Sequence, residues 1–437
     1  MLNKNKDTRF FMKSNVFLIR ASKNDIARLA IQIENFKKYN VDFYIIEENY
    51  NEPLTLTHFK SSNHLVIGPD YLKNNQLNHF PKVGWQCGDY IAYAGYSFFP
   101  NYDFYWVVDS DLYLNIDMNK LLQITDQINL DCLALDYDIA SNNWYWYQSL
   151  ASEYKDVYRM LYCLIRLSKP AVKFLKDKRS AYHPRIDNNQ YHKFANDECF
   201  TATVLTNEGF LCGKIQNFLP QYFKNQLFSL NNPFYLEELN HPYATNQIIH
   251  PICDAERYQD KLKPLLAKNQ LNIFTDKTYR LFCHVGEERC KEITGFSFLE
   301  IYKKNYNSDS ILNLFEFSKI IKERNLPNVE ADFFWRSTIY VINFSLKKVV
   351  FGVDFSADGS VYIVARNYIS KIIMNKYFGC EKFCAIKQIK FINKDINIIL
   401  KDNHIDNVIE IIFWFFSLID REVVIEKKSG VQACLYI

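Results

Sequence analysis

Two carboxylates separated by one residue form the strongest chemical pattern in this sequence. The apolar run at residues 104–108 (FYWVV) leads directly into Asp109, Ser110 and Asp111. Such a run predicts a buried strand, and because side chains alternate along a strand, the two carboxylates share one side of it. In α/β proteins, ligands bind at the carboxyl ends of the strands. Asp109 and Asp111 therefore predict a divalent-cation site, and a cation held there would neutralise a diphosphate.

Other interpretations of these carboxylates depend on the residues that follow them. Phosphatases of the haloacid-dehalogenase type carry a similar motif on their first strand, with Thr or Val soon after it. Here Leu112 and Tyr113 follow, and at least two predicted strands precede the motif. An EF-hand loop requires Gly at its sixth position, where this chain has Leu114. A solvated strand end is the plain structural alternative to a metal site.

The elements that would position these carboxylates alternate between strand and helix. Residues 15–20 and 41–47 are apolar runs, and the intervening residues 22–39 repeat apolar side chains at helical spacing. This order predicts a right-handed βαβ unit in a parallel sheet. Further strands are expected at residues 65–67, 104–108 and 132–135, with a helix at residues 89–99. The pattern predicts an α/β, Rossmann-like nucleotide-binding domain over residues 1–255.

The second half of the chain changes character. Residues 254–270 and 308–324 have helical patterns, and we expect a helical connection over residues 256–330. From residue 334 onward, short β-branched and aromatic runs are separated by turn residues, such as Ala-Asp-Gly at 357–359. These runs predict a β-rich module over residues 331–437, with a sandwich as the expected form.

Composition narrows the class of protein. The 437 residues are 48% hydrophobic and 16% aromatic, which excludes intrinsic disorder. The charge is nearly balanced, with 52 basic and 49 acidic residues, so no nucleic-acid partner is indicated. The 11 cysteines lack paired CxxC spacing, and no apolar run reaches the length of a membrane span. We therefore expect a cytoplasmic protein with reduced thiols, with association at the inner face of the membrane as an open alternative.

The segment at residues 83–90 (VGWQCGDY), a predicted helix, and residues 105–111 (YWVVDSD) together resemble bacterial glycosyltransferases of the GT-A fold. Proteins of this kind are common in capsule and lipopolysaccharide gene clusters. The resemblance covers roughly residues 12–255 and identifies no particular family within the fold. It implies that an Asp at the start of the helix before the metal motif contacts the sugar nucleotide, and Asp89 holds that position.

The resemblance also implies a metal ligand near the end of the domain, usually His. His250 fits, because the apolar residues 247–249 precede it and Pro251 follows. His241 is the weaker candidate because it lacks an apolar strand before it. An imidazole beside two carboxylates suits Mn²⁺ or a similar ion better than Ca²⁺, and Mg²⁺ is the alternative. A surface His before a turn is the structural alternative.

A third expected feature is an acidic residue at a helix N-terminus that faces the acceptor hydroxyl in inverting enzymes. Asn196, Asp197 and Glu198 open a predicted helix. A carboxylate there can accept the hydroxyl proton, and Glu198 is slightly favoured over Asp197. Helix capping would explain the same residues, and a retaining mechanism would follow if neither carboxylate is the base.

Contacts to the two substrates are predicted from strand ends and from aromatic residues. Beside Asp89 and Asp109, the donor contacts are expected from Arg20 at the end of the first strand, Glu47 or Glu48 at the end of the second, and Lys82. Acceptor contacts are expected from residues 136–147, because aromatic faces stack on sugar rings and polar neighbours bind hydroxyls. The candidates there are Asp138, Trp144 and Trp146. An aromatic cluster that closes the core is the alternative.

Together these features predict a metal-dependent glycosyltransferase that moves a sugar from a nucleotide-sugar donor to a glycan or glycolipid acceptor in bacterial surface polysaccharide synthesis, with inversion slightly favoured. A catalytically silent glycan-binding or scaffold protein is the alternative. A sugar-phosphate nucleotidyltransferase is a second alternative, although residues 18–25 lack its Gly-rich phosphate loop. The β-rich module would bind acceptor glycan or support self-association into a homo-oligomer.

Overall fold

The computed structural model divides the chain into two compact units. Unit 1 comprises residues 1–228 and 246–252, and unit 2 comprises residues 229–245 and 253–437. Within these ranges the structure describes residues 13–21, 26–50, 63–182, 194–223, 227–241, 244–305, 330–336, 339–346, 349–356, 361–366, 371, 374 and 382–384. The chain therefore enters the second unit at residues 229–245, returns to the first unit at residues 246–252, and then completes the second unit. No sequence pattern indicates this return.

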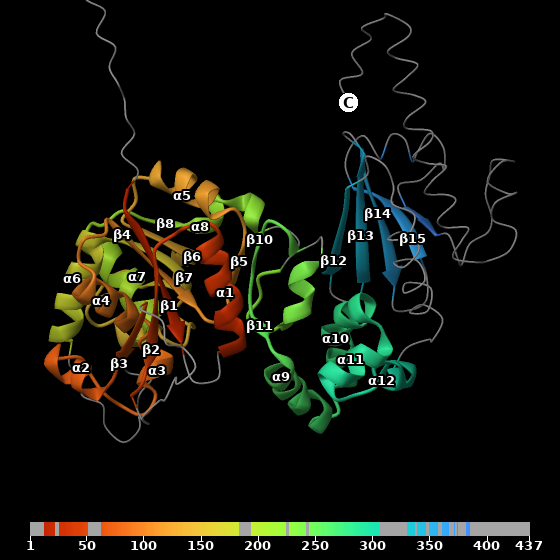
Figure 1. The fold of residues 1–437 in the computed structure, drawn as a ribbon, viewed down its shortest axis with the longest axis horizontal. Helices are drawn as coiled ribbons and strands as arrows, with labels where there is room; N and C mark the ends of the chain where they lie inside the picture. Colours follow the sequence, from red (N-terminus) through yellow and green to blue (C-terminus); the bar gives the residue numbers. More distant parts are fainter. Residues whose placement is uncertain are drawn as a thin grey trace, which may run out of the picture. The chain divides into compact units, whose positions relative to one another are not determined.

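A seven-stranded sheet forms the centre of the first unit (Figure 1). Its strands are β1 (Asn15–Ala21), β2 (Phe43–Glu48), β3 (His64–Ile67), β4 (Phe104–Asp109), β6 (Cys132–Ile139), β7 (Tyr158–Ser168) and β8 (Cys212–Lys214). They lie in the order β3-β2-β1-β4-β7-β6-β8, and β7 alone among them runs antiparallel to its neighbours. The predicted α/β class is therefore confirmed.

Helices cover both faces of this sheet. They are α1 (Ile26–Lys38), α2 (Pro69–Asn74), α3 (Val83–Gln86), α4 (Asp89–Phe98), α5 (Met118–Asp126), α6 (Lys169–Ala181), α7 (Asp197–Asn207) and α8 (Ile215–Phe218), with 3₁₀ turns η1 (Tyr147–Ser149) and η3 (Pro220–Tyr222). Alternation along β1 divides the core. Val16 and Leu18 pack with α4, α6 and α7, whereas Phe17 and Ile19 pack with α1 and α5. A short antiparallel pair, β5 (Tyr113–Asn115) and β10 (Gln247–Ile249), brings a distant segment to the end of β4.

Strand β7 is the longest strand of the sheet, and the sequence pattern did not predict it. It runs for 11 residues and contributes Arg166, which is fully buried. The guanidinium donates hydrogen bonds to the carbonyl oxygens of Thr125, Ile128 and Leu130, and lies 4.2 Å from the ring centroid of Phe104. A charged residue inside a strand is uncommon, and here it is tolerated because both terminal nitrogens of the guanidinium donate to backbone carbonyl groups.

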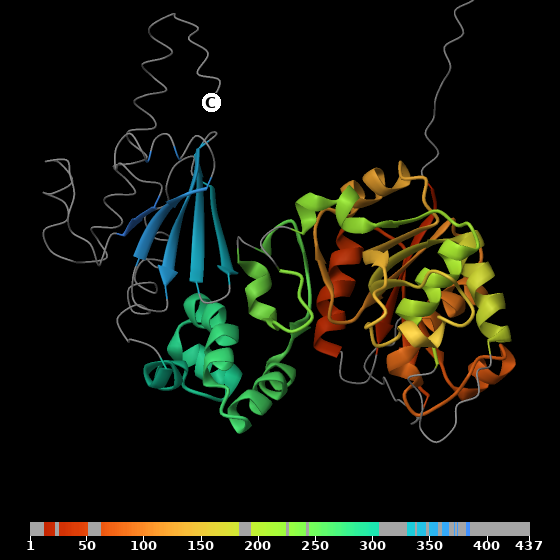
Figure 2. The ribbon, with the colours of Figure 1, turned by 180° about the vertical axis from the view of Figure 1, so that it is seen from behind.

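The second unit combines helices with an antiparallel sheet (Figure 2). Its helices are α9 (Ala255–Ala267), α10 (Leu271–Val285), α11 (Glu287–Thr294) and α12 (Phe298–Asn305), with 3₁₀ turn η5 (Leu236–Asn240), and short strands β9 (Phe234–Tyr235) and β11 (Ile252–Cys253). The sheet strands are β12 (Glu330–Arg336), β13 (Ile339–Leu346), β14 (Val349–Ser356), β15 (Val361–Ala365) and β16 (Lys382–Cys384), in sequential order. These strands form a single sheet. The expected helix at 308–324, the turn at 357–359 and the expected strands beyond residue 384 lie outside the described residues.

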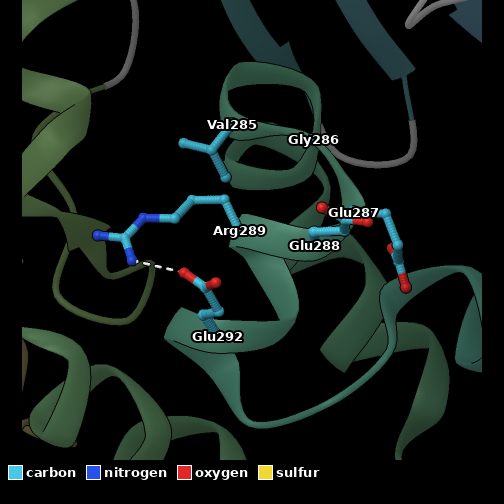
Figure 3. Close-up of a pocket in the computed structure, with 6 residues that line it drawn as sticks. All are labelled: Val285, Gly286, Glu287, Glu288, Arg289 and Glu292. Carbon is cyan, nitrogen blue, oxygen red and sulfur yellow. Dashed lines mark hydrogen bonds and ion pairs between the residues drawn. The ribbon is translucent and has the colours of Figure 1, made fainter.

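An open pocket of about 350 Å³ lies at the start of α11 (Figure 3). Its lining is largely acidic, and Arg289 donates to Glu292 at 2.7 Å within it. The lining residues are Val285, Gly286, Glu287, Glu288, Arg289 and Glu292. All of them belong to the second unit, so this pocket contains none of the predicted site residues. No helix within the described residues combines the length and apolar character of a membrane span.

Candidate active site

Three strand ends bring charged side chains together at one edge of the sheet in the first unit. Arg20 lies directly across from Asp109 in the register of β1 and β4. Its Nε atom lies 2.8 Å from Oε2 of Glu48, at the end of β2, and its guanidinium lies 3.6 Å from Oδ1 of Asp109. The carboxyl ends of parallel strands meet at one edge, so this cluster follows from the topology.

The second carboxylate of the motif is held beside His250. Nε2 of His250 lies 3.4 Å from Oδ1 of Asp111, and both side chains are largely buried. The β5–β10 pairing brings the two residues together, and the backbone N–H of Ile252 donates to the carbonyl oxygen of Asp111 at 2.8 Å. The ring of Phe228 stacks on His250 with centroids 5.2 Å apart. The pairing of two short strands thus brings together two residues, Asp111 and His250, that are about 140 residues apart in the sequence.

The pKa of Asp109 reflects this crowded environment. Burial raises it, the Arg20 guanidinium lowers it, the Asp111 carboxylate raises it and His250 lowers it. The Oδ1 atom of Asp109 is buried, and the Arg20 guanidinium at 3.6 Å lies just beyond hydrogen-bond distance from it. A carboxylate oxygen left without a hydrogen-bond donor is a group that a bound cation would satisfy.

The described residues contain no group of three or more His, Cys, Asp or Glu side chains arranged to hold a metal ion alone. A Mg²⁺ or similar ion bound together with a diphosphate requires only one or two protein carboxylates, because phosphate oxygens and water complete the coordination. Asp109 and Asp111 fit that requirement, with His250 as an adjacent nitrogen donor.

The acidic pair opens helix α7 as expected, but its two members differ in environment. Asn196 caps the helix by accepting the N–H of Cys199 at 3.0 Å. Asp197 accepts the N–H of Gly88 at 2.8 Å and the N–H of Glu198 at 2.8 Å, and only 4% of it is exposed. A side chain at Gly88 would collide with Asp197, because an added Cβ would lie 2.6 Å from Oδ2. Asp197 therefore ties α7 to the turn before α4.

Glu198 is a buried carboxyl group with a raised pKa. Burial raises the pKa of Glu198 to about 7, although hydrogen bonds to Asn196 and to the backbone of Tyr162 oppose the shift. The Asp109 carboxylate also raises this pKa, so the two carboxylates are close enough to repel each other. Burial, followed by repulsion from Glu198, raises the pKa of Asp197 further above its usual range. A base whose pKa lies near the operating pH is the more effective one, which favours Glu198.

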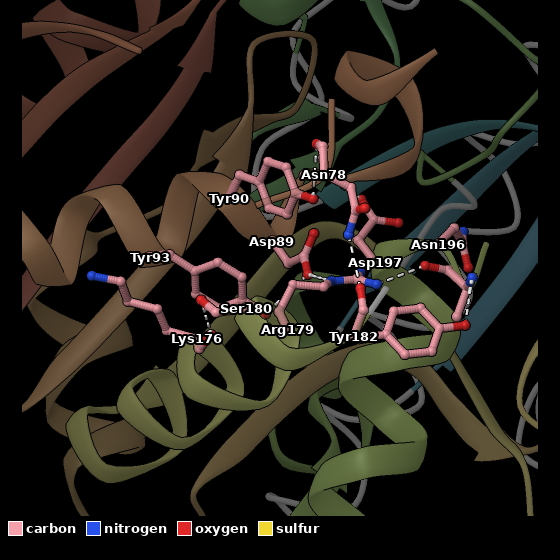
Figure 4. Close-up of polar contacts among 12 residues, drawn as sticks. Asn78, Asp89, Tyr90, Tyr93, Lys176, Arg179, Ser180, Tyr182, Asn196 and Asp197 are labelled. Atoms are coloured by element: carbon pink, nitrogen blue, oxygen red, sulfur yellow. Dashed lines mark hydrogen bonds and ion pairs between the residues drawn. The ribbon is translucent and has the colours of Figure 1, made fainter. Parts of the chain in front are cut away.

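Asp89 lies inside the protein at the start of α4. Its side chain is fully buried, and Oδ2 accepts from Nε of Arg179 at 2.7 Å and from the hydroxyl of Tyr93 at 2.9 Å (Figure 4). Arg179 also donates to the carbonyl oxygen of Ala195 at 2.8 Å, and its guanidinium lies 3.8 Å from the ring centroid of Phe200. The Oδ1 atom of Asp89 is buried without a hydrogen bond, and the expected donor contact stays a prediction. The ion pair joins α4, α6 and the segment that leads into α7.

We expect Arg179→Met to destabilise the protein by about 3–5 kcal/mol, because it leaves the Asp89 carboxylate buried and unpaired. Lys178→Met is the matched control, since Lys178 pairs with Glu208 on the surface with 43% of its side chain exposed, and should cost under about 1 kcal/mol. Urea unfolding of both variants measures the difference. Equal losses would show that the Asp89–Arg179 pair does not hold these helices.

Strand alternation also corrects the expected role of Glu47. The Glu47 side chain is fully buried and its Oε2 lies 2.8 Å from Nε2 of His64, away from Arg20. Glu48 occupies the place beside Arg20, because successive residues of β2 point to opposite faces. Lys82 is exposed where α3 begins, and its predicted contact with a phosphate stays a prediction.

The predicted acceptor residues differ in exposure, and one of them, Trp146, contacts the first turn of α7. Trp146 is 6% exposed, and its carbonyl oxygen accepts the thiol of Cys199 at 3.5 Å. Trp144 is half-buried and Asp138 is exposed. Sequence reasoning missed Trp85, which lies 5.8 Å from Trp146 between ring centroids and is 66% exposed. Trp85 belongs to residues 83–90, the segment on which the resemblance to glycosyltransferases was based, and that membership could have marked it as a candidate.

No protein-family model and no curated protein matches the sequence. Among solved structures, a glycosyltransferase involved in the glycosylation of the major capsid of PBCV-1 shares 15% identity over 40% of this chain and 73% of that chain, with a TM-score of 0.21. The glycosyltransferase GlyE of Streptococcus pneumoniae TIGR4 shares 11% identity over 55% of each chain, with a TM-score of 0.27. A 4-diphosphocytidyl-2C-methyl-D-erythritol synthase from Anaerococcus prevotii DSM 20548 shares 9% identity over 46% of this chain and 88% of that chain, with a TM-score of 0.28. A functional assignment therefore rests on the geometry of the site.

Proposed function

We propose that the first unit transfers a sugar from a nucleoside-diphosphate sugar to a hydroxyl of a glycan or glycolipid, with the help of Mn²⁺ or Mg²⁺. The observation that carries this proposal is the meeting of Asp109, Asp111, Arg20 and His250 at one sheet edge, with Glu198 close enough for the Asp109 carboxylate to raise its pKa. This combination offers ligands for a cation, a guanidinium for a phosphate and a base for a hydroxyl.

Each side chain has a separate task in this reaction. Asp109 and Asp111 would hold the cation, with His250 beside them, and the cation would neutralise the diphosphate as it leaves. Arg20, ion-paired with Glu48, would bind a phosphate oxygen of the donor. Glu198 would accept the acceptor hydroxyl proton as the oxygen attacks the anomeric carbon. Attack from the face opposite the leaving diphosphate inverts the configuration of the sugar.

A nucleoside diphosphate with Mn²⁺ should raise the melting temperature of the protein. A ligand at about 100 times its dissociation constant stabilises the folded state by roughly 2.7 kcal/mol. Differential scanning fluorimetry with UDP, GDP and CDP, each with Mn²⁺ or with EDTA, measures this shift. If none of the three nucleotides moved the transition, the silent glycan-binding or scaffold alternative would be favoured.

Hydrolysis of the donor separates the transferase from the nucleotidyltransferase alternative. A transferase releases nucleoside diphosphate slowly from UDP-, GDP- or CDP-sugars, whereas a nucleotidyltransferase would form the nucleotide sugar from a sugar phosphate and a nucleoside triphosphate. A role in surface polysaccharide synthesis, peripheral membrane association and self-association through the β-rich module follow as further predictions of the same proposal.

A further inference from the structure

Two strongly exposed aromatic rings lie in segments that are hydrogen-bonded to the first turn of α7. Trp85 and Tyr145 are each 66% exposed, and both contact the buried Trp146, with ring centroids 5.8 Å and 4.7 Å from it. The two contacts are inclined, with interplanar angles of 50° for Trp85 and 86° for Tyr145. Trp146 thus packs against both exposed rings. We call Trp85, Tyr145 and Trp146 together the aromatic platform.

This platform is attached to the helix that carries the proposed base. Trp85 lies three residues before Gly88, whose N–H donates to Asp197 at 2.8 Å. Trp146 is held through its carbonyl oxygen, which accepts from Cys199 at 3.5 Å and from Ser149 at 2.6 Å. Both attachments reach the first turn of α7, which also contains Glu198. A molecule on the platform would therefore lie near Glu198. It would also lie beside the charged strand ends, because a Cβ added at Gly84 would be 4.0 Å from Oε2 of Glu48 and one added at Gly88 would be 2.9 Å from the Arg20 guanidinium.

The surroundings of the platform fit an uncharged polyhydroxyl ligand. Residues 138–152 (DIASNNWYWYQSLAS) contain one acidic residue, Asp138, and no Lys or Arg. Ser141, Asn142, Asn143 and Gln148 are exposed in this segment, and their hydroxyl and amide groups both donate and accept hydrogen bonds. On the Trp85 side, residues 82–90 contribute the exposed Lys82 as their single basic residue. An anionic membrane surface would instead require a cluster of several basic residues around the aromatic rings.

We propose that Trp85 and Tyr145 bind a pyranose ring of the acceptor, with the apolar C–H face of the sugar stacked on the indole. This inference rests on the proposed function and adds that the acceptor is a carbohydrate chain presented to Glu198 by its sugar rings. Ring stacking contributes to affinity through the apolar area that it removes from water, while the polar neighbours select the hydroxyl pattern. Trp85 is the principal residue, because an indole offers the largest apolar face.

Saturation-transfer NMR on the full-length protein tests this proposal with cellotriose, chitotriose and lactose as probes. We expect saturation of the C–H protons on one ring face in at least one probe. Trp85→Ala should weaken that binding about tenfold, corresponding to the loss of one covered ring face. Trp85→Phe, which keeps an aromatic face, should retain most of it. Tyr145→Ala provides a second variant with an expected smaller loss.

Phe98→Ala is the matched control, because Phe98 is an aromatic residue with 50% exposure that belongs to no part of the platform. It should bind the probes as the wild type does. Fluorimetry with UDP, GDP and CDP in the presence of Mn²⁺ should give the same shift for Trp85→Ala and wild type. If no probe binds, or Trp85→Ala binds them normally, the carbohydrate platform is wrong.

Two further results would also overturn the platform as an acceptor site. Weaker nucleotide binding by Trp85→Ala would assign the indole to the donor base, and Trp85-dependent sedimentation with phosphatidylglycerol vesicles would assign it to a membrane. The proposed function fails separately, when no nucleotide binds the wild type. Trp85-dependent probe binding in that case would leave a glycan-binding protein without transferase activity.

Discussion

Asp111→Asn should reduce sugar transfer about 10³-fold while changing the melting temperature by only a few degrees. The substitution removes one of the two carboxylates proposed to hold the cation, and stabilisation of the leaving diphosphate by a metal contributes several kcal/mol to the transition state. The structural cost is small because Asp111 lies at the end of the sheet in contact with His250, outside both hydrophobic clusters. Donor hydrolysis assayed over a range of Mn²⁺ concentrations measures the effect.

Asp70→Asn is a suitable control for this experiment, because Asp70 is an exposed carboxylate in the first turn of α2. It should leave both activity and its dependence on Mn²⁺ unchanged. Asp111→Asn should also lose the Mn²⁺-dependent thermal shift with nucleoside diphosphates. Full activity of the wild type in EDTA would contradict the metal requirement.

Glu198→Gln should lower kcat about 10²–10⁴-fold and have little effect on nucleotide binding, because it removes the proposed base but no donor ligand. Wild-type kcat should rise as the pH passes through about 7, the value to which burial raises the pKa of Glu198. Only the ionised carboxylate can accept a proton, so activity requires a pH above that value. A pH–rate profile that is flat between pH 5 and 9, or unchanged kcat in the variant, would exclude Glu198 as the base; these pH limits span about two pH units on each side of the pKa.

The same substitution should stabilise the protein at high pH. The pKa of Glu198 is raised in the folded state from the ordinary value of 4.5 to about 7, so ionisation is easier in the unfolded chain. The folded state therefore loses stability as the pH rises between these two values, by at most about 3 kcal/mol. Below pH 4.5 both states are protonated and the wild type and Glu198→Gln should be equally stable. Urea unfolding at pH 5, near the lower pKa, and at pH 8, above the higher pKa, measures this change in the free energy of unfolding.

Local patterns in the sequence were sufficient for the parallel half of the sheet. Strands β1, β2 and β4 are buried between two layers of helices, and this burial requires runs of consecutive apolar residues. The buried face of α1 likewise requires apolar residues at helical spacing, so all four elements could be predicted from neighbouring residues. The Asp-x-Asp motif was visible for the same reason, since a buried strand that ends in carboxylates places them at the edge where ligands bind.

Contacts between distant segments were decided by the tertiary structure. Antiparallel β7 lies between β4 and β6, and its inclusion of Arg166 is tolerable only because carbonyl groups from another segment accept its hydrogen bonds. Segment 246–252 returns to the first unit after an excursion into the second, which places His250 beside Asp111. Neither the acceptors of Arg166 nor the contact between His250 and Asp111 can be predicted from local sequence patterns, because the partners are far apart in the sequence.

The roles of single acidic residues depended on which face they occupy and what lies opposite. Glu47 and Glu48 are neighbours of identical chemistry, yet one meets His64 and the other meets Arg20. Asp89 opens a helix as expected, but Arg179 approaches it from a helix some 90 residues later and encloses it. Sequence by itself thus determined that carboxylates gather at strand and helix ends. The tertiary structure decided which of these carboxylates face the site, because the partners of each one come from segments that are distant in the sequence.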